Sequence, residues 1–108
     1  MYKYLILDHF AKQLKSIVKK HRTVKQKMIE VLISFRKEQA ISLGNGVYKL
    51  RIGTDGGGKS GGYRILIWVL EIEHLIVPFC IYAKSERENI SLKDMNNHLA
   101  KIKADFTS

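Results

Sequence analysis

The 108-residue chain contains one cysteine and one proline, and both lie in the same apolar run, from Leu75 to Ala83. A single cysteine cannot form an internal disulfide, and Cys80, which has apolar neighbours, is most simply a small buried hydrophobic residue. The four histidines are scattered along the chain, and none has a second candidate ligand at a familiar metal-binding interval. We therefore expect no disulfide, no metal ion and no catalytic thiol.

Long hydrophobic runs are also missing. No segment reaches the ~18 consecutive apolar residues of a membrane span. The first eight residues contain too short an apolar run, and no small-residue cleavage site, for a signal peptide. These absences predict a cytoplasmic protein without membrane contact, and the length predicts one domain over residues 1–108.

Acidic residues are scarce: ten Asp and Glu stand against nineteen Lys and Arg, which gives a net charge of +9. Between Met1 and Met28 there are eight basic residues and one acid. Such a field favours polyanionic partners, either nucleic acid or an acidic protein. A solvated basic surface is the simpler alternative, and for the individual lysines of the first helix we prefer it.

Apolar periodicity predicts three helices. The first extends from after Asp8, its expected cap, to about Lys20, and the second follows a capping-box pattern at residues 23–26 and extends to about Gln39. A second capping-box pattern at residues 91–94 begins the last helix. The apolar stripes that define the three helices are Phe10, Leu14, Ile17 and Val18; Val24, Met28, Val31, Leu32 and Phe35; and Leu92, Met95, Leu99, Ile102 and Phe106.

Strand patterns occupy residues 3–7, 47–52, 63–70 and 75–83. Residues 47–52 alternate apolar and polar, so Lys49 and Arg51 should emerge on one face. Leu43 to Gly46 marks the end of the helical part, and Pro78 implies an edge position or a bulge in the last strand. The resulting order is β-α-α-β-β-β-α, an α+β fold with helices packed on a mostly antiparallel sheet.

The stretch Gly53 to Ser60 matches the phosphate-binding pattern G-x-x-x-x-G-K-[ST]. A P-loop needs a helix directly after the lysine, whereas the residues that follow have a strand pattern. No apolar strand ending in Asp is available for magnesium either. We therefore expect no nucleotide cofactor, and instead a hairpin loop that places Lys59 where it could close over an RNA backbone.

The hairpin formed by the last two strands would place Arg64 and Lys84 at its mouth, where two cations could hold a phosphate between Tyr63 and Tyr82. At such a mouth, Arg64 should contribute little to the core. RNA supplies its own nucleophile, the 2′-hydroxyl, so a ribonuclease needs only proton transfer and charge neutralisation. Lysine and arginine can provide both without a metal, and the basic candidates on this half of the chain are Lys49, Arg51, Lys59, Arg64, Lys84 and Arg87.

Three motifs, YKLR at 48–51, GGYRIL at 61–66 and YAKSER at 82–87, together resemble the RelE/HigB superfamily of toxins, and its HigB-like branch most closely. The resemblance implies a RelE-like fold and cleavage of messenger RNA in the ribosomal A site. It also implies a cognate antitoxin, a HigA-like helix-turn-helix protein. By position, it makes Lys49 and Arg51 a basic pair, Arg64 the phosphate-binding residue and Lys84 the basic residue that closes the last strand.

Two positions depart from the archetypal RelE toxin, which has an arginine where this chain has Ser85 and a tyrosine where it has Ser91. Arg87 or Lys59 could replace the arginine, Tyr82 or Tyr63 the tyrosine, and His98 is a more remote candidate acid. Two other functions therefore stay open. One is a non-catalytic domain that binds RNA or protein, and the other is a ParE-like toxin that acts on DNA gyrase.

Overall fold

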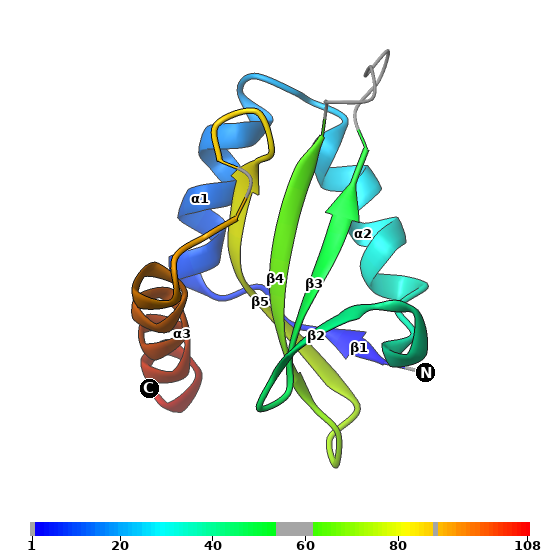
Figure 1. The fold of residues 1–108 in the computed structure, drawn as a ribbon, viewed down its shortest axis with the longest axis vertical. Helices are drawn as coiled ribbons and strands as arrows, with labels where there is room; N and C mark the ends of the chain where they lie inside the picture. The colour runs from blue at the N-terminus through cyan, green and yellow to red at the C-terminus, as the bar shows by residue number, and fades with distance from the viewer. Residues whose placement is uncertain (1, 54–61, 88) are drawn as a thin grey trace.

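The computed structural model describes residues 2–53, 62–87 and 89–108 (Figure 1). Lys59 and most of the P-loop-like stretch lie outside these residues. A sheet in the order β1-β5-β4-β3-β2 is packed with helices, which confirms the predicted α+β class. Its strands are β1 (Lys3–Tyr4), β2 (Ile41–Gly44), β3 (Val47–Ile52), β4 (Tyr63–Leu70) and β5 (Leu75–Ala83), and the helices are α1 (Asp8–Val18), α2 (Val24–Ile33) and α3 (Leu92–Thr107), with a short 3-10 turn, η1 (Lys37–Gln39).

The antiparallel strands β3, β4 and β5 form the predicted meander. β4 is bonded on both sides and covered on both faces, so residues 63–67 are all buried, which explains their nearly continuous apolar sequence. β1 is shorter than predicted and pairs in parallel with the start of β5.

The predicted bulge lies at Pro78. Leu66 is opposite Cys80 but Ile67 is opposite Pro78, which leaves Phe79 as an extra residue in β5. The side chain of Gln13, on α1, bonds the backbone there: it donates to the Phe79 carbonyl at 3.0 Å and accepts from the Ile81 N–H at 3.2 Å. Gln13 thus takes the place of a neighbouring strand beside the bulge.

The helices are divided between the two faces of the sheet. Tyr63 of β4 contacts His21, between α1 and α2, while Trp68 of the same strand contacts Phe106 of α3. Since odd and even residues of a strand face opposite ways, α1 and α2 cover one face and α3 the other. Figure 1 shows α1 on the β5 side of the sheet and α2 on the β3 side.

The second helix ends at Ile33, and its predicted extension to Gln39 is wrong. The Ser34 hydroxyl bonds back to the Glu30 carbonyl, and the chain then turns so that Phe35 is buried at 8% exposure. The residues that follow lead into β2, a strand that the sequence did not predict. Leu43 to Gly46 therefore forms the end of β2 and the turn of a β2–β3 hairpin, in which Asn45 and Gly46 have positive φ.

Helix caps agree with prediction at one site of three. The Ser91 hydroxyl accepts from the Asp94 N–H at 3.1 Å, as expected. Thr23 makes no side-chain cap bond, and Leu7, not Asp8, is the N-cap of α1. The N-terminus of α1 is instead satisfied from α3, where the Asp105 carboxylate accepts from the His9 N–H at 2.8 Å.

No helix among the described residues is long and apolar enough to cross a membrane.

Candidate nucleic-acid interface

Three side chains form a row across the sheet: Arg51 of β3 is opposite Arg64 of β4, and Arg64 is opposite Tyr82 of β5. Directly paired residues point to the same face, and so do residues two apart, which adds Lys49 to the set. Trp68, four residues after Arg64, contacts α3. The four residues Lys49, Arg51, Arg64 and Tyr82, here called the basic face, therefore lie on the α3 side of the sheet.

Arg64 is buried, with 8% exposure, and it is the one buried charged residue of the part that the structure describes. The prediction that Arg64 lies at the mouth of the hairpin and contributes little to the core is wrong, because β3 and β5 flank it on both sides. One guanidinium nitrogen donates to the Tyr63 carbonyl at 3.3 Å, and no ion pair of Arg64 occurs within the described residues. The buried charge and its remaining N–H groups suit an anionic ligand.

Tyr82 is 7% exposed, and its hydroxyl oxygen meets no hydrogen-bond partner of good geometry among the described residues. Burial raises the pKa of this phenol, whereas the nearby charges of Arg64 and Arg87 and a poorly aligned hydrogen bond with the Ile90 backbone act in the opposite direction. The Arg87 guanidinium carbon lies 5.9 Å from the centre of the Tyr82 ring, within cation–π range. The phenol therefore shares the basic face with Arg64 and has the Arg87 guanidinium near its ring.

A pocket of about 210 Å³ opens beside the basic face. The Lys49 ammonium donates to the Asn89 side-chain oxygen at 3.3 Å, which directs the lysine toward the loop before α3. Apolar walls with a few polar groups suit a planar ring such as a nucleobase. The residues that line the pocket are Leu43, Lys49, Tyr82, Asn89, Ile90, Leu92 and Met95.

Asn89 and Leu43 were not predicted as site residues. Asn89 lies in a loop, and Leu43 lies on the unpredicted strand β2. No local pattern marks either residue, because each reaches the site through a contact with a distant segment.

Lys84 and Arg87 follow β5 in the turn at its end. The Lys84 N–H donates to the Gly62 carbonyl, so Lys84 is level with Gly62 and not with Arg64. Gly62 has φ +99°, and a Cβ there would lie 2.5 Å from the Ile52 carbonyl oxygen, so a glycine is required where the chain enters β4. Arg87 pairs with Asp94 at 3.6 Å, with both side chains about half exposed.

One predicted placement is wrong. Tyr63 does not flank the cations, because it is adjacent to Arg64 in the strand and points to the opposite face, where it contacts His21.

Two histidines that are far apart in the sequence meet in the structure. His98 of α3 contacts His9 of α1, with 2.8 Å between Nδ1 of His98 and Nε2 of His9.

Cys80 is buried, as predicted, and burial raises the pKa of its thiol to about 11.

A family model described as the RelE toxin of the RelE / RelB toxin-antitoxin system matches residues 9–107. The chain belongs to the RelE toxin family. The match spans the whole basic face and all three helices apart from the first residue of α1. A search of curated proteins finds no match. Membership of the RelE family makes this chain the toxin of a toxin–antitoxin system and implies an antitoxin partner.

Proposed function

We propose that this RelE-family toxin is a ribosome-dependent endoribonuclease that cleaves messenger RNA in the cytoplasm and so stops translation. The observation that supports this most is the row Arg51–Arg64–Tyr82, with Lys49 two residues away on the same face. A buried arginine that has no acidic partner among the described residues, flanked by the exposed Arg51, the half-buried Lys49 and a phenol, fits a phosphate better than it fits a structural role.

In this proposal the 2′-hydroxyl of the RNA attacks the adjacent phosphorus. Its proton passes to a base, the bond to the 5′ oxygen breaks, and that oxygen receives a proton as a 2′,3′-cyclic phosphate forms. Arg64 holds the non-bridging oxygens as negative charge accumulates on them. Arginine stays charged, so proton exchange falls to the lysines at this end of the sheet, Lys49 and Lys84, while Arg51 binds the neighbouring phosphate.

Ser91 is the N-cap of α3, so it supplies a helix cap where the archetypal toxin has a tyrosine. Tyr82 is the aromatic residue that borders both the row and the pocket. We therefore assign the contact with a base to Tyr82, and the Tyr63 alternative fails on its orientation. Arg87, whose guanidinium carbon lies 5.9 Å from the centre of the same ring, would add a phosphate contact.

The test is expression of the chain in a growing cell, with pulse labelling of new protein and primer extension on abundant messages. We expect translation to stop and messages to be cut within their translated regions. Purified chain should cut a message bound to ribosomes and leave the same message intact without them. Growth arrest with intact messages and altered DNA supercoiling would instead identify a gyrase toxin, and folded chain with neither effect would identify a non-catalytic domain.

The same proposal assigns the chain to the HigB-like branch. It follows that the neighbouring reading frame should encode a HigA-like helix-turn-helix antitoxin. Co-expression of that protein should restore growth, and a gene without such a neighbour would argue against the branch.

A further inference from the structure

The imidazole rings of His9 and His98 meet on the β5 side of the sheet, although the two residues are 89 positions apart in the chain. Nε2 of His9 is 2.8 Å from Nδ1 of His98, and the ring centres are 5.0 Å apart. Gln13, one turn after His9, bonds the backbone of β5, so this part of α1 lies along the margin of the sheet. The histidine pair therefore joins helices that cover opposite faces.

Two imidazole nitrogens that face each other are suitable ligands for a transition metal such as Zn²⁺, Ni²⁺ or Cu²⁺. Zinc binds imidazole nitrogen at about 2.0–2.1 Å, so two nitrogens on a tetrahedral ion are about 3.3 Å apart. The two rings would have to separate by only about 0.5 Å from their hydrogen-bonded distance to admit the ion. Both side chains are half-buried and lie on separate helices, so an ion can reach them and a shift of this size is small.

We propose that His9 and His98 together bind one zinc-class transition-metal ion, which fastens α1 to α3. The ion would take the place of the shared hydrogen. The ring that donates this hydrogen would carry it on its other nitrogen instead, so that both facing nitrogens offer a lone pair and no proton is lost.

The site would have two protein ligands. Among the described residues no group of three His, Cys, Asp or Glu is placed to hold a metal ion, so water would fill the other positions. With about half the ligands of a structural zinc site, the pair should bind Zn²⁺ with a dissociation constant of roughly 1–200 µM.

The charges around the pair are mixed. The Asp105 carboxylate accepts from the His9 N–H at 2.8 Å, and Asp94 lies one turn before His98 on α3; both favour a cation. Burial lowers the pKa of both histidines, so near neutral pH both rings are uncharged and can act as ligands. The cations that oppose metal binding are Lys12, Lys101 and Arg87. Binding must therefore come from the imidazoles, which excludes Mg²⁺ and Ca²⁺.

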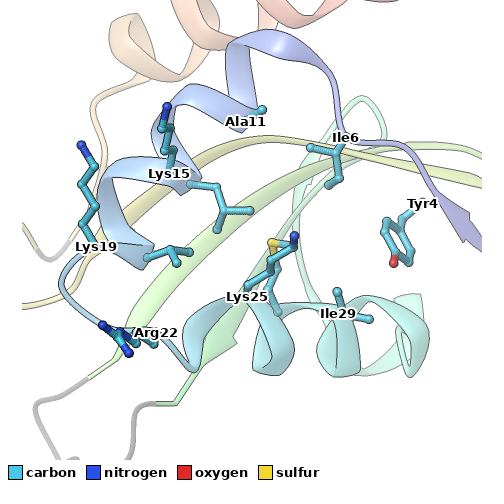
Figure 2. A pocket seen from close by; sticks show the side chains of 11 residues that line it. Tyr4, Ile6, Ala11, Lys15, Lys19, Arg22, Lys25 and Ile29 are labelled. Carbon is cyan, nitrogen blue, oxygen red and sulfur yellow. The ribbon is translucent and has the colours of Figure 1, made fainter.

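The largest cavity of the described residues is not a competing metal site. It is a groove of about 1000 Å³ between α1 and α2 (Figure 2). Its lining contains no His, Cys, Asp or Glu, and its cations are Lys15, Lys19, Arg22 and Lys25. The groove therefore offers a metal ion no ligand of these types and repels it.

The position of His98 on α3 gives the ion its consequence. Leu92 and Met95, on the first turn of the same helix, line the pocket beside the basic face. An ion that holds α3 to α1 would hold this wall of the pocket in place. Amide hydrogen exchange in α3 should therefore slow when Zn²⁺ is added.

The test titrates Zn²⁺ into EDTA-treated chain without a histidine tag, with calorimetry for binding and circular dichroism for the unfolding midpoint. We expect one ion per chain and a midpoint that rises by several degrees at about tenfold excess over the dissociation constant. Mg²⁺ should do neither. His98→Gln should weaken Zn²⁺ binding about tenfold or more, whereas the matched control His21→Gln, which removes an exposed imidazole, should bind as the wild type does.

NMR provides a measurement that needs no substitution. The ring signals of His9 and His98 should shift together on addition of Zn²⁺, whereas those of His21 and His74 should stay in place, because each of these contacts a tyrosine ring and not a second histidine. Lys101→Gln removes a cation that acts on both rings and should tighten Zn²⁺ binding a few-fold.

The outcomes separate the site from its alternatives. No Zn²⁺ binding by the wild type, or equal binding by wild type and folded His98→Gln, overturns the site. An equal response to Mg²⁺ would show a general attraction of cations and also overturns it. Zinc that shifts both rings but leaves exchange in α3 unchanged overturns the fastening of the helices. The inference does not depend on the proposed nuclease, because none of these measurements involves RNA.

Discussion

Arg64 of β4 is directly opposite Tyr82 of β5 because Phe79 is an extra residue in β5. Without this bulge, Ile81 would be opposite Arg64, and Tyr82 would face α1 and α2, since a shift of one residue exchanges the faces of a strand. The bulge therefore brings the Tyr82 side chain to the basic face, opposite Arg64. A backbone irregularity near Pro78 thus determines the composition of the candidate catalytic site.

The first prediction concerns Arg64. Arg64→Met keeps most of the apolar stem and removes the charge, so cleavage of ribosome-bound message should fall by about 10²–10³. The unfolding midpoint should be equal to or above that of the wild type, because the buried guanidinium has no acidic partner among the described residues. Arg64→Lys should recover only part of the activity, because an ammonium cannot reproduce the paired hydrogen bonds of the fork.

The matched control is Arg36→Met, in an exposed position after α2. It should retain wild-type cleavage. If folded Arg64→Met cleaves message as fast as the wild type does, the assignment of Arg64 to the phosphate is wrong.

The second prediction concerns the Tyr82 hydroxyl. A buried hydroxyl without a partner of good geometry destabilises the folded chain, so Tyr82→Phe should leave the free energy of unfolding unchanged or raise it by about 1 kcal/mol. Urea unfolding measures this. If RNA uses the hydroxyl, the same variant should cleave more slowly despite its stability, whereas Tyr82→Leu should additionally weaken RNA binding through loss of the ring. A large loss of stability in Tyr82→Phe would reveal a structural bond and contradict the prediction.

Sequence alone predicted those parts of the fold that depend on periodicity within one segment. The alternation of β3 correctly placed Lys49 and Arg51 on one face, and the apolar runs correctly paired β4 with β5. β2 was missed because it is a four-residue exposed edge strand. The second helix was predicted too long because Phe35 continues its apolar spacing, although Phe35 is buried from the segment that follows the helix. The apolar pattern of a sequence does not distinguish a buried residue within a helix from one beyond its end.

The candidate site was predicted less completely than the fold. The pairing of residues across the strands depends on the register, and the register depends on the bulge at Phe79. Pro78 indicated a bulge or an edge position in this strand, but it did not indicate which residue would be the extra one. Two other expectations failed for different reasons: Tyr63 is next to Arg64 in the same strand and so points to the opposite face, and Lys84 is level with Gly62 instead of Arg64. The contact between Lys49 and Asn89 joins segments forty residues apart, and nothing in either segment indicates it.

The third prediction concerns Gln13, which bonds the Phe79 carbonyl and the Ile81 N–H beside the bulge. Gln13→Ala leaves both backbone groups without this partner, and the free energy of unfolding should fall by about 1–3 kcal/mol. Gln26→Ala, at an exposed position on α2, makes the same chemical change and should stay within about 0.5 kcal/mol of the wild type. If the two variants are equally stable, the side chain does not support the bulge.

The fourth prediction concerns the contact between His9 and His98, which joins α1 to α3. Burial is the largest cause that lowers the pKa of both imidazoles, and the Lys101 ammonium lowers both further. Lys12 also lowers the pKa of His9, whereas Asp105 raises it. Arg87 also lowers the pKa of His98, whereas Asp94 raises it. Two nitrogens 2.8 Å apart share one hydrogen, so protonation of both rings breaks the bond.

The sign of the pH effect follows from these lowered pKa values. The unfolded chain takes up protons at about pH 6.5, and the folded chain only at lower pH, so the unfolded state binds more protons in between. The free energy of unfolding should therefore decline as the pH falls below about 6.5 and be insensitive to these groups above it. The double variant His9→Gln/His98→Gln should lose much of this dependence in urea titrations from pH 7.5 to 5.

Lys101→Gln provides an independent check, because it removes a cation that acts on both rings and leaves the hydrogen bond in place. The pKa values of His9 and His98 should rise when they are followed through their ring-proton signals by NMR, and the loss of stability toward pH 5 should become smaller. Lys93→Gln, at an exposed position on the first turn of α3 that does not contribute to either shift, is the matched control. If both histidines titrate in Lys101→Gln as they do in the wild type and in Lys93→Gln, the Lys101 ammonium does not lower their pKa values.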